Sequence, residues 1–234
     1  MGVAEMVRAK SLRAGTLSRL KGYASGDDGV AAVEFAFIAP ILLLLLLAGF
    51  DVGRFVLATQ RVERVAGSVA QMLAETPASS PGSQVGYVSS NDLLFDWNSA
   101  MFTFPDVLAA ANAQNTNWWN MLNVQMSSIN FVATPAGCTT NCNYTAKVLW
   151  SLGARSCGSS IQPVTDSTYY SPTTLPADIF GPRSMIVVDV TYAWTPSVGA
   201  AYLPSIPIVR SAFLSPRAVQ LVESQAYGLA NPCP

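Results

Sequence analysis

Glu34 is the residue whose chemical type is least expected at its position. It is the only charged residue between positions 30 and 50, an apolar run of 21 residues. A helix over this run is about 31 Å long at 1.5 Å per residue, which is the thickness of a bilayer core. A charge inside such a helix is costly and usually functional. Gly29 directly precedes the run as a candidate processing site, so the pattern predicts a segment that leaves the membrane and joins an assembly.

Two interpretations of Glu34 are open. On insertion scales a central leucine contributes roughly −0.3 to −0.6 kcal/mol, and a central charge costs roughly 2.5 to 3.5 kcal/mol. The six leucines at positions 42–47 therefore offset the carboxylate, and the segment should still insert. Glu34 lies near one end of the run, so its side chain can reach the membrane interface. Alternatively, it meets a positive charge on a neighbouring subunit.

The sequence lacks the residues of the common catalytic and metal sites. It has no histidine, which removes Ser-His-Asp and Cys-His nucleophiles and His-based metal sites. No phosphate-binding loop or dinucleotide fingerprint is present. Asp92 and Asp96 fit a solvated helix face, and strand alternation explains Asp189. Core packing is favoured over sugar or peptide stacking for Trp118 and Trp119. We therefore expect no enzyme, no cofactor and no metal.

The four cysteines all follow the apolar run, and their even number fits two disulfides, for which three connectivities are open. We favour Cys138–Cys142 as a loop clasp and Cys157–Cys233 as a pin for the C-terminal tail. Zinc is the competing interpretation, but a C-x₃-C spacing without histidine suits it poorly.

Charge predicts the topology of the chain. The basic residues before the run are Arg8, Lys10, Arg13, Arg19 and Lys21, and such residues favour the cytoplasmic side. We expect a cytoplasmic N-terminus and an exported C-terminal body, where disulfides persist. The formal net charge of −1 gives no reason to expect nucleic-acid binding. The predicted parts are a basic leader (1–29), a transmembrane and stem helix (30–75), a linker (76–83) and an exported head (84–234).

The predicted helix continues beyond the membrane run. Apolar residues recur every three or four positions, as in a heptad seam: Val52, Phe55, Thr59, Val62, Ala66, Val69 and Leu73. The seam packs either on the chain's own head or on another molecule. Gly49-x-x-x-Gly53 permits close helix approach, although this spacing is common by chance. Pro40 removes a backbone donor and should kink the helix.

The head reads as α+β with a small, mainly antiparallel sheet. Short helices are expected at 91–101, with Asn91 as N-cap, and at 105–113, with Pro105 in the first turn. Alternation and β-branched residues predict strands at 122–132, 144–152, 185–194, 208–214 and 218–222. Residues 157–182 are expected to be mostly loop.

The N-terminal residues resemble the TadE family of tight-adherence (Flp-type) pili. The similarity lies in Gly29-x₄-Glu34-Phe35-Ala36-x₃-Pro40, the leucine run, and Gly49-x₃-Gly53-Arg54. Residues 187–196 and Ser215-Pro216-Arg217 are similar less specifically. The resemblance implies a bacterial pseudopilin or minor pilin that a prepilin peptidase cuts between Gly29 and Val30. Glu34 would then pair with the new α-amino group of Val30, on its own chain or a neighbour's, which selects register more than it adds stability.

The resemblance also implies the setting. The expected partners are other pseudopilins and pilins, the prepilin peptidase, the inner-membrane assembly platform and the lipid bilayer, with the head in the periplasm. The large head and the Glu34-Phe35 pair argue for a minor component over the repeating filament subunit. Asp27-Asp28 differs from the basic flank of many prepilins, so the alternative is a permanently anchored, exported binding domain outside any pilus. An anchored enzyme is the third interpretation, and it would need an active site without histidine.

Overall fold

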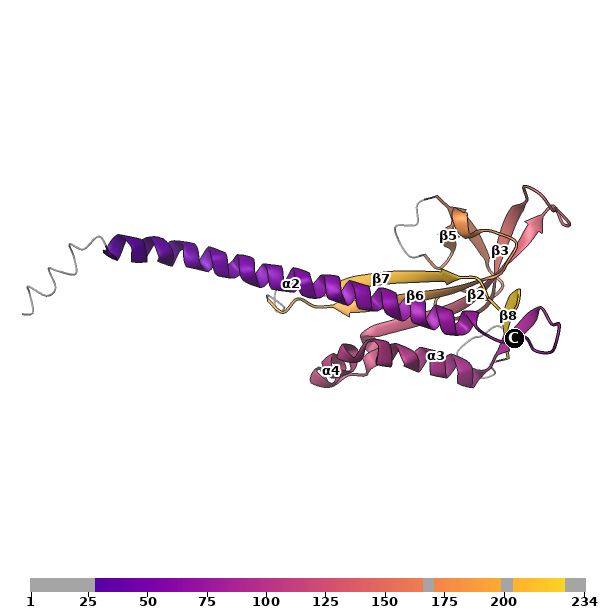
Figure 1. The fold of residues 1–234 in the computed structure, drawn as a ribbon, viewed down its shortest axis with the longest axis horizontal. Coiled ribbons are helices and arrows are strands. Elements are labelled where there is room, and N and C mark those ends of the chain that lie inside the picture. Colours follow the sequence, from indigo (N-terminus) through magenta and orange to yellow (C-terminus); the bar gives the residue numbers. More distant parts are fainter. Residues whose placement is uncertain (1–27, 166–170, 199–203, 226–234) are drawn as a thin grey trace, which may run out of the picture. The chain divides into compact units, whose positions relative to one another are not determined.

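A long helix dominates the N-terminal half of the described chain. The computed structural model describes residues 28–165, 171–198 and 204–225 (Figure 1). Helix α2 (Asp28–Ala74) is 47 residues long and contains Pro40 without ending there. The chain divides into two compact units, Met1–Gly53 and Arg54–Pro234. In the first unit the described residues are α2 alone, and the second unit is the head with the stem part of α2.

A six-stranded sheet forms the centre of the head unit. Its strand order is β5-β4-β3-β2-β6-β7, and only the β4–β5 pair is parallel. The strands are β2 (Leu122–Thr134), β3 (Asn143–Leu152), β4 (Ser160–Val164), β5 (Thr174–Pro176), β6 (Met185–Trp194) and β7 (Ile206–Leu214). The predicted α+β class, with a long helix and a mainly antiparallel sheet, is confirmed.

The first core lies between one face of this sheet and the helices. The stem part of α2 lies on the same side as α3 (Ser90–Thr103) and α4 (Pro105–Ala113) (Figure 1). Val62, Val65, Val69 and Leu73 of the stem are fully buried. The outer half of the predicted seam therefore packs on the chain's own head, which was one of the two open alternatives. Trp118, in the 3₁₀ turn η1 (Trp118–Asn120), also belongs to this core.

The second core lies on the opposite face of the sheet. It gathers Ile129, Phe131, Val148 and Val187 under β4, β5 and the 3₁₀ turn η2 (Ala177–Ile179). Because both faces are covered, β6 is buried at five consecutive positions, 186–190. A strand covered on both faces carries apolar residues without alternation.

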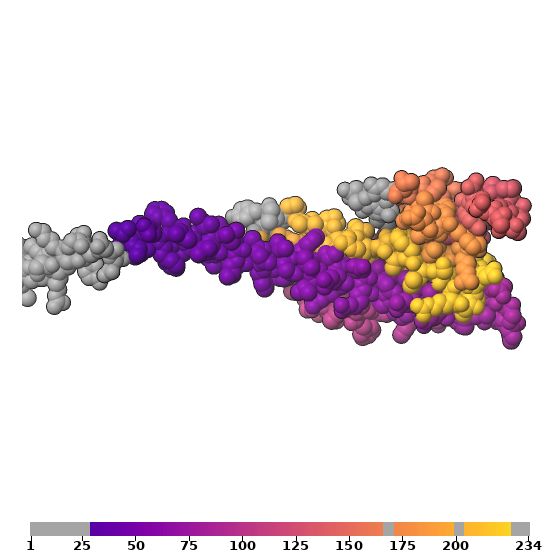
Figure 2. Space-filling model, turned by 45° about the horizontal axis from the view of Figure 1, so that its top comes forward, coloured from indigo at the N-terminus to yellow at the C-terminus, as the bar shows by residue number. Residues whose placement is uncertain are grey.

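A second, two-stranded sheet closes the end of the stem. Strand β1 (Val85–Val88) pairs in parallel with β8 (Leu221–Ser224). The Arg217 backbone N–H donates to the Ala74 carbonyl at 2.8 Å, so the C-terminal segment also satisfies the last turn of α2. Figure 2 shows the yellow C-terminal atoms directly against the purple end of the stem.

The structure corrects several local predictions. Helix α3 starts at Ser90 with Ser89 as N-cap, not Asn91. The Ser89 hydroxyl accepts from the Asp92 N–H, and the Asp92 carboxylate accepts from the Ser89 N–H, which is a capping box. Residues 157–182 contain β4, β5 and η2 where loop was expected, and β1 was not predicted. The last strand is Leu221–Ser224, displaced from the predicted 218–222.

Candidate functional site on the long helix

The side chains of the apolar run are exposed along α2. From Gly29 to Phe50 no described residue is buried, and Val30, Phe35 and Phe37 are 60%, 68% and 75% exposed. Apolar side chains of this size are normally removed from water, and a continuous exposed set marks an interaction surface. By length and composition, α2 is the one helix among the described residues that can cross a membrane, from Gly29 onward. The sequence expectation of a single apolar helix is met.

Glu34 lies one helical turn after Val30 on this open surface. Residues four apart on a helix lie on the same face, about 5–6 Å apart at their Cβ atoms. An α-amino group at Val30 would therefore be within reach of the Glu34 carboxylate. Within the described part of the chain, Glu34 has no ion-pair partner, so any cation that meets it must come from elsewhere. The cut after Gly29 and the pairing of Glu34 stay predictions.

The two glycines at the end of the run are not needed for packing within the described chain. A Cβ built on Gly49 or Gly53 meets no other atom within 4 Å. Glycine inside a helix costs about 1 kcal/mol relative to alanine. The role of Gly49 and Gly53 in helix packing therefore stays a prediction.

The stem is held in the head by contacts on its buried side. Phe55 meets the edge of Trp194 at 5.3 Å between ring centroids. Arg61 forms an ion pair with Asp106 of α4 and also lies over the Phe104 ring, 5.6 Å from its centroid. The stem therefore cannot rotate independently of the head. No local sequence pattern predicts the Arg61–Asp106 pair, because the partners lie on different helices.

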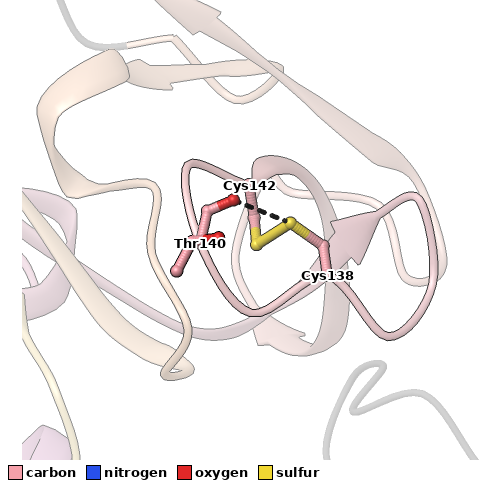
Figure 3. The surroundings of a disulfide bond; sticks show 3 residues. All are labelled: Cys138, Thr140 and Cys142. Carbon is pink, nitrogen blue, oxygen red and sulfur yellow. Dashed lines mark hydrogen bonds between the residues drawn. A yellow bond between two sulfur atoms is a disulfide. The ribbon is translucent and has the colours of Figure 1, made fainter.

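One predicted disulfide is present and the other lies partly outside the described residues. Cys138 and Cys142 are bonded in the connection between β2 and β3 (Figure 3). The Cys138 sulfur lies 3.4 Å from the Thr140 carbonyl oxygen. This is a close contact and not a hydrogen bond, because a disulfide sulfur carries no hydrogen. Cys157 is disulfide-bonded. Cys233 lies outside the described residues, so the Cys157–Cys233 pairing remains a prediction.

Two acidic residues of the head are buried, and one of them contradicts the sequence interpretation. Asp96 is only 7% exposed, so it does not lie on a solvated helix face as expected. Asp189 is buried on the second face of β6, where it forms an ion pair with Arg155 and accepts a hydrogen bond from the Ser211 hydroxyl at 2.5 Å. Strand alternation places Asp189 opposite Val188 and Val190, as predicted, and the ion pair with Arg155 accounts for a carboxylate at a buried position.

Gly153 allows Arg155 to reach this position. Its φ is +156°, and a Cβ there would lie 2.6 Å from the Gln125 side chain. Glycine permits both the backbone conformation and the close approach. The Ala154 N–H then donates to the Gln125 Oε1 at 3.1 Å. Among the described residues, no group of three or more His, Cys, Asp or Glu side chains is placed to hold a metal ion.

The two neighbouring tryptophans, Trp118 and Trp119, differ in how far they are buried. Trp118 is 7% exposed and packs 4.5 Å from Trp97, as expected for a core residue. Trp119 is 45% exposed and lies 6.0 Å from the same ring. Core packing therefore explains the first tryptophan, and it explains the second only in part.

The described residues thus combine an exposed apolar helix, with Glu34 near its start, and an α+β head that carries a disulfide. Residues 29–71 match the family model described as TadE-like protein. The resemblance seen in the sequence is thereby confirmed for this segment, which contains Gly29, Glu34 and the stem. TadE-like proteins are structural pilus components. No curated protein and no solved structure matches the chain.

Proposed function

We propose that the chain is a pseudopilin, or minor pilin, that takes part in the assembly of a tight-adherence (Flp, type IVb-like) pilus for surface attachment. The observation that carries this proposal is the open apolar surface of residues 29–50 with Glu34 as its only carboxylate, inside the segment that matches the TadE-like family. A helix of this kind can occupy a bilayer first and the apolar interior of a filament later. The head would remain in the periplasm, and the N-terminus in the cytoplasm.

Processing by a prepilin peptidase between Gly29 and Val30 prepares the helix for assembly. The cut removes the basic leader, which otherwise holds the N-terminus at the cytoplasmic face. It also creates an α-amino group one turn from Glu34. In an apolar bundle, either charge alone is costly, so the bundle favours the register in which an amine and a carboxylate meet. The partners are then other pilins and pseudopilins, the peptidase and the inner-membrane assembly platform.

The first experiment is the intact mass of the chain from its native membranes. The proposal expects a mature chain that begins at Val30. Gly29→Leu should leave the full-length chain, while Gly26→Leu, the same change three residues earlier, should still be cut. A wild-type chain that keeps residues 1–29 would instead support a permanently anchored binding domain.

The second experiment tests the role of the carboxylate. Glu34→Ala should still insert, because removing a charge lowers the insertion cost, but piliation should fall. Glu63→Ala, which removes an exposed carboxylate from the stem, is the matched control. Normal piliation of the Glu34 variant, with a mature chain present, would contradict the pairing.

A further inference from the structure

A cavity of about 300 Å³ opens at the C-terminal end of α4. This volume is at the lower end of the range of small-molecule sites, so it suits one ring-sized ligand better than an extended one. The lining consists of three amides and one hydroxyl: Asn112, Asn115, Thr116 and Asn117. It therefore offers hydrogen bonds and no ionic contact.

The backbone holds the lining residues in place. Asn115 has a left-handed conformation, with a φ of +50°. Its N–H donates to the Asn112 carbonyl at 3.2 Å, and the Thr116 N–H donates to the Ala111 carbonyl at 3.0 Å. These two bonds form a Schellman motif, which ends α4. The Asn120 side-chain N–H donates to Thr116 Oγ1 at 3.0 Å, so the turn is also tied to η1.

The amides at the cavity are available to a ligand. Among the described residues, the side chains of Asn112, Asn115 and Asn117 form no hydrogen bond, and all three residues are exposed. Each amide carries an N–H₂ donor and a carbonyl acceptor, so the set can donate and accept at once. A ligand with several hydroxyl groups needs this combination.

The lining does not favour a charged ligand. None of the four lining residues carries a charge. The acidic residue of α4 is Asp106, which is paired with Arg61 and lies six residues before Asn112, about 9 Å along the helix. An ion in the cavity would lose water without gaining an opposite charge from the lining, so a neutral ligand fits better.

An exposed aromatic ring follows the cavity residues in the chain. Trp119 comes two residues after Asn117 and is 45% exposed. Its ring lies 6.0 Å from the Trp97 ring, with 41° between the planes, and 6.0 Å from the Trp118 ring. These contacts restrict the ring but leave almost half of the residue uncovered. The face of an aromatic ring packs well on the C–H groups of a sugar ring, whose hydroxyl groups bind amides.

We propose that the C-terminal end of α4 is a binding site for a neutral sugar. Asn112, Asn115 and Asn117 bind the hydroxyl groups, and Trp119 packs on one face of the ring. The inference goes beyond the proposed function, because it concerns the head alone and does not depend on processing or on membrane insertion.

Saturation-transfer difference NMR on the full chain tests the binding. The chain is kept in lauryldimethylamine oxide micelles, because this detergent carries no sugar that could compete. The probes are the methyl glycosides of glucose, galactose, mannose and N-acetylglucosamine, each titrated to obtain a Kd. Glycerol, a polyol without a ring, is the control for adventitious binding.

Two variants locate the site. Asn115→Gly removes the amide, while glycine keeps the left-handed φ without strain. Its matched control is Asn141→Gly, the same change at another asparagine with a positive φ, +52°, in the disulfide loop. Trp119→Ala removes the ring. Thermal melts of each variant show whether the head is folded, and Asn115→Gly keeps the test valid if Trp119→Ala unfolds.

We expect at least one glycoside to bind, with a Kd about five-fold higher in Asn115→Gly. The Kd should rise about ten-fold in Trp119→Ala and stay unchanged in Asn141→Gly. No saturable signal from any glycoside overturns the inference. An equal signal from glycerol, or binding that Asn115→Gly does not weaken, means an adventitious additive only and also overturns it. Neither result changes the expected mature chain at Val30, so the proposed function is tested separately.

Discussion

Asp96 carries an ionisable group on the buried side of α3. Burial and, to a smaller extent, the nearby Asp92 carboxylate together raise the pKa of its carboxyl from 3.8 to about 6. A raised pKa means that the folded state favours the protonated form. The contribution of Asp96 to stability is therefore fully present below pH 3.8 and is lost as the pH rises through about 6.

Asp96→Asn should stabilise the head at neutral pH, because the amide cannot ionise. The expected gain at pH 7.5 is on the order of 1–3 kcal/mol, and it should shrink toward zero near pH 4. Thermal unfolding of both proteins between pH 4 and pH 8 measures it. Asp178→Asn, which changes an exposed carboxylate, should have little effect. A gain for Asp96→Asn that does not vary with pH would contradict the titration.

Arg155 and Asp189 form a buried pair that is sensitive to the loss of either partner. Their side chains are 3% and 2% exposed. Asp189→Leu leaves the guanidinium buried without its counter-ion and should cost about 3–5 kcal/mol. The double variant Arg155→Met with Asp189→Leu should recover most of this loss. Denaturant unfolding of the single and double variants measures the coupling, and simple additivity would argue against the pair.

At the scale of elements, the stem differs sharply between its two sides. Leu73 is fully buried against the head, whereas Leu57, also on the stem, is 54% exposed. Leu73→Ala should cost about 2–5 kcal/mol because it leaves a cavity. In detergent, Leu57→Ala should lower the free energy of unfolding much less, because Leu57 is exposed on the stem and its truncation leaves no cavity. Equal losses in chemical unfolding would mean that the buried seam does not hold the stem.

The elements that the sequence predicted well are those with long, consistent local signals. Helix α4 occupies the predicted residues 105–113 and β6 the predicted 185–194. Proline in the first turn predicts the start of α4, and a ten-residue stretch rich in β-branched and aromatic residues predicts β6. Strands β1, β4 and β5 have only four, five and three residues, so their existence depends on partners distant in sequence. Asp96 was misjudged because its burial depends on how α3 is covered. The alternation around Asp189 was predicted correctly, but its burial depends on the cover over the second face of the sheet.

The candidate site divides in the same way. The exposed run and its single carboxylate are local facts, and the sequence was sufficient to single them out. The burial of the outer seam could not be predicted from the sequence, because a heptad pattern fits packing on another copy as well as packing on the chain's own sheet. Only the tertiary structure distinguishes these.

For the whole molecule, the two predicted disulfides should differ in their contribution. In the chain-entropy account, the loop closed by Cys138 and Cys142 is worth about 2 kcal/mol, and a loop from Cys157 to Cys233 is worth about 4–5 kcal/mol. Replacing Cys157 and Cys233 by alanine should therefore lower the melting temperature more than replacing Cys138 and Cys142. Thermal melts of both pairs, with the reduced wild type beside them, measure this. A larger loss for the short loop would argue against the Cys157–Cys233 pairing.

The parallel pairing of β1 with β8 sets an order of events for a chain that is threaded through a translocon. Strand β1 begins shortly after the stem, but its partner strand β8 comes about 130 residues later in the chain. The Ala74 carbonyl likewise accepts its hydrogen bond from Arg217, which is synthesised much later. The stem can leave the channel early, but its outer end stays unsealed until almost the entire polypeptide has crossed. Under the export proposed above, completion of translocation becomes a condition for closing the head: a prematurely terminated chain lacks β8, and the edge of β1 stays open.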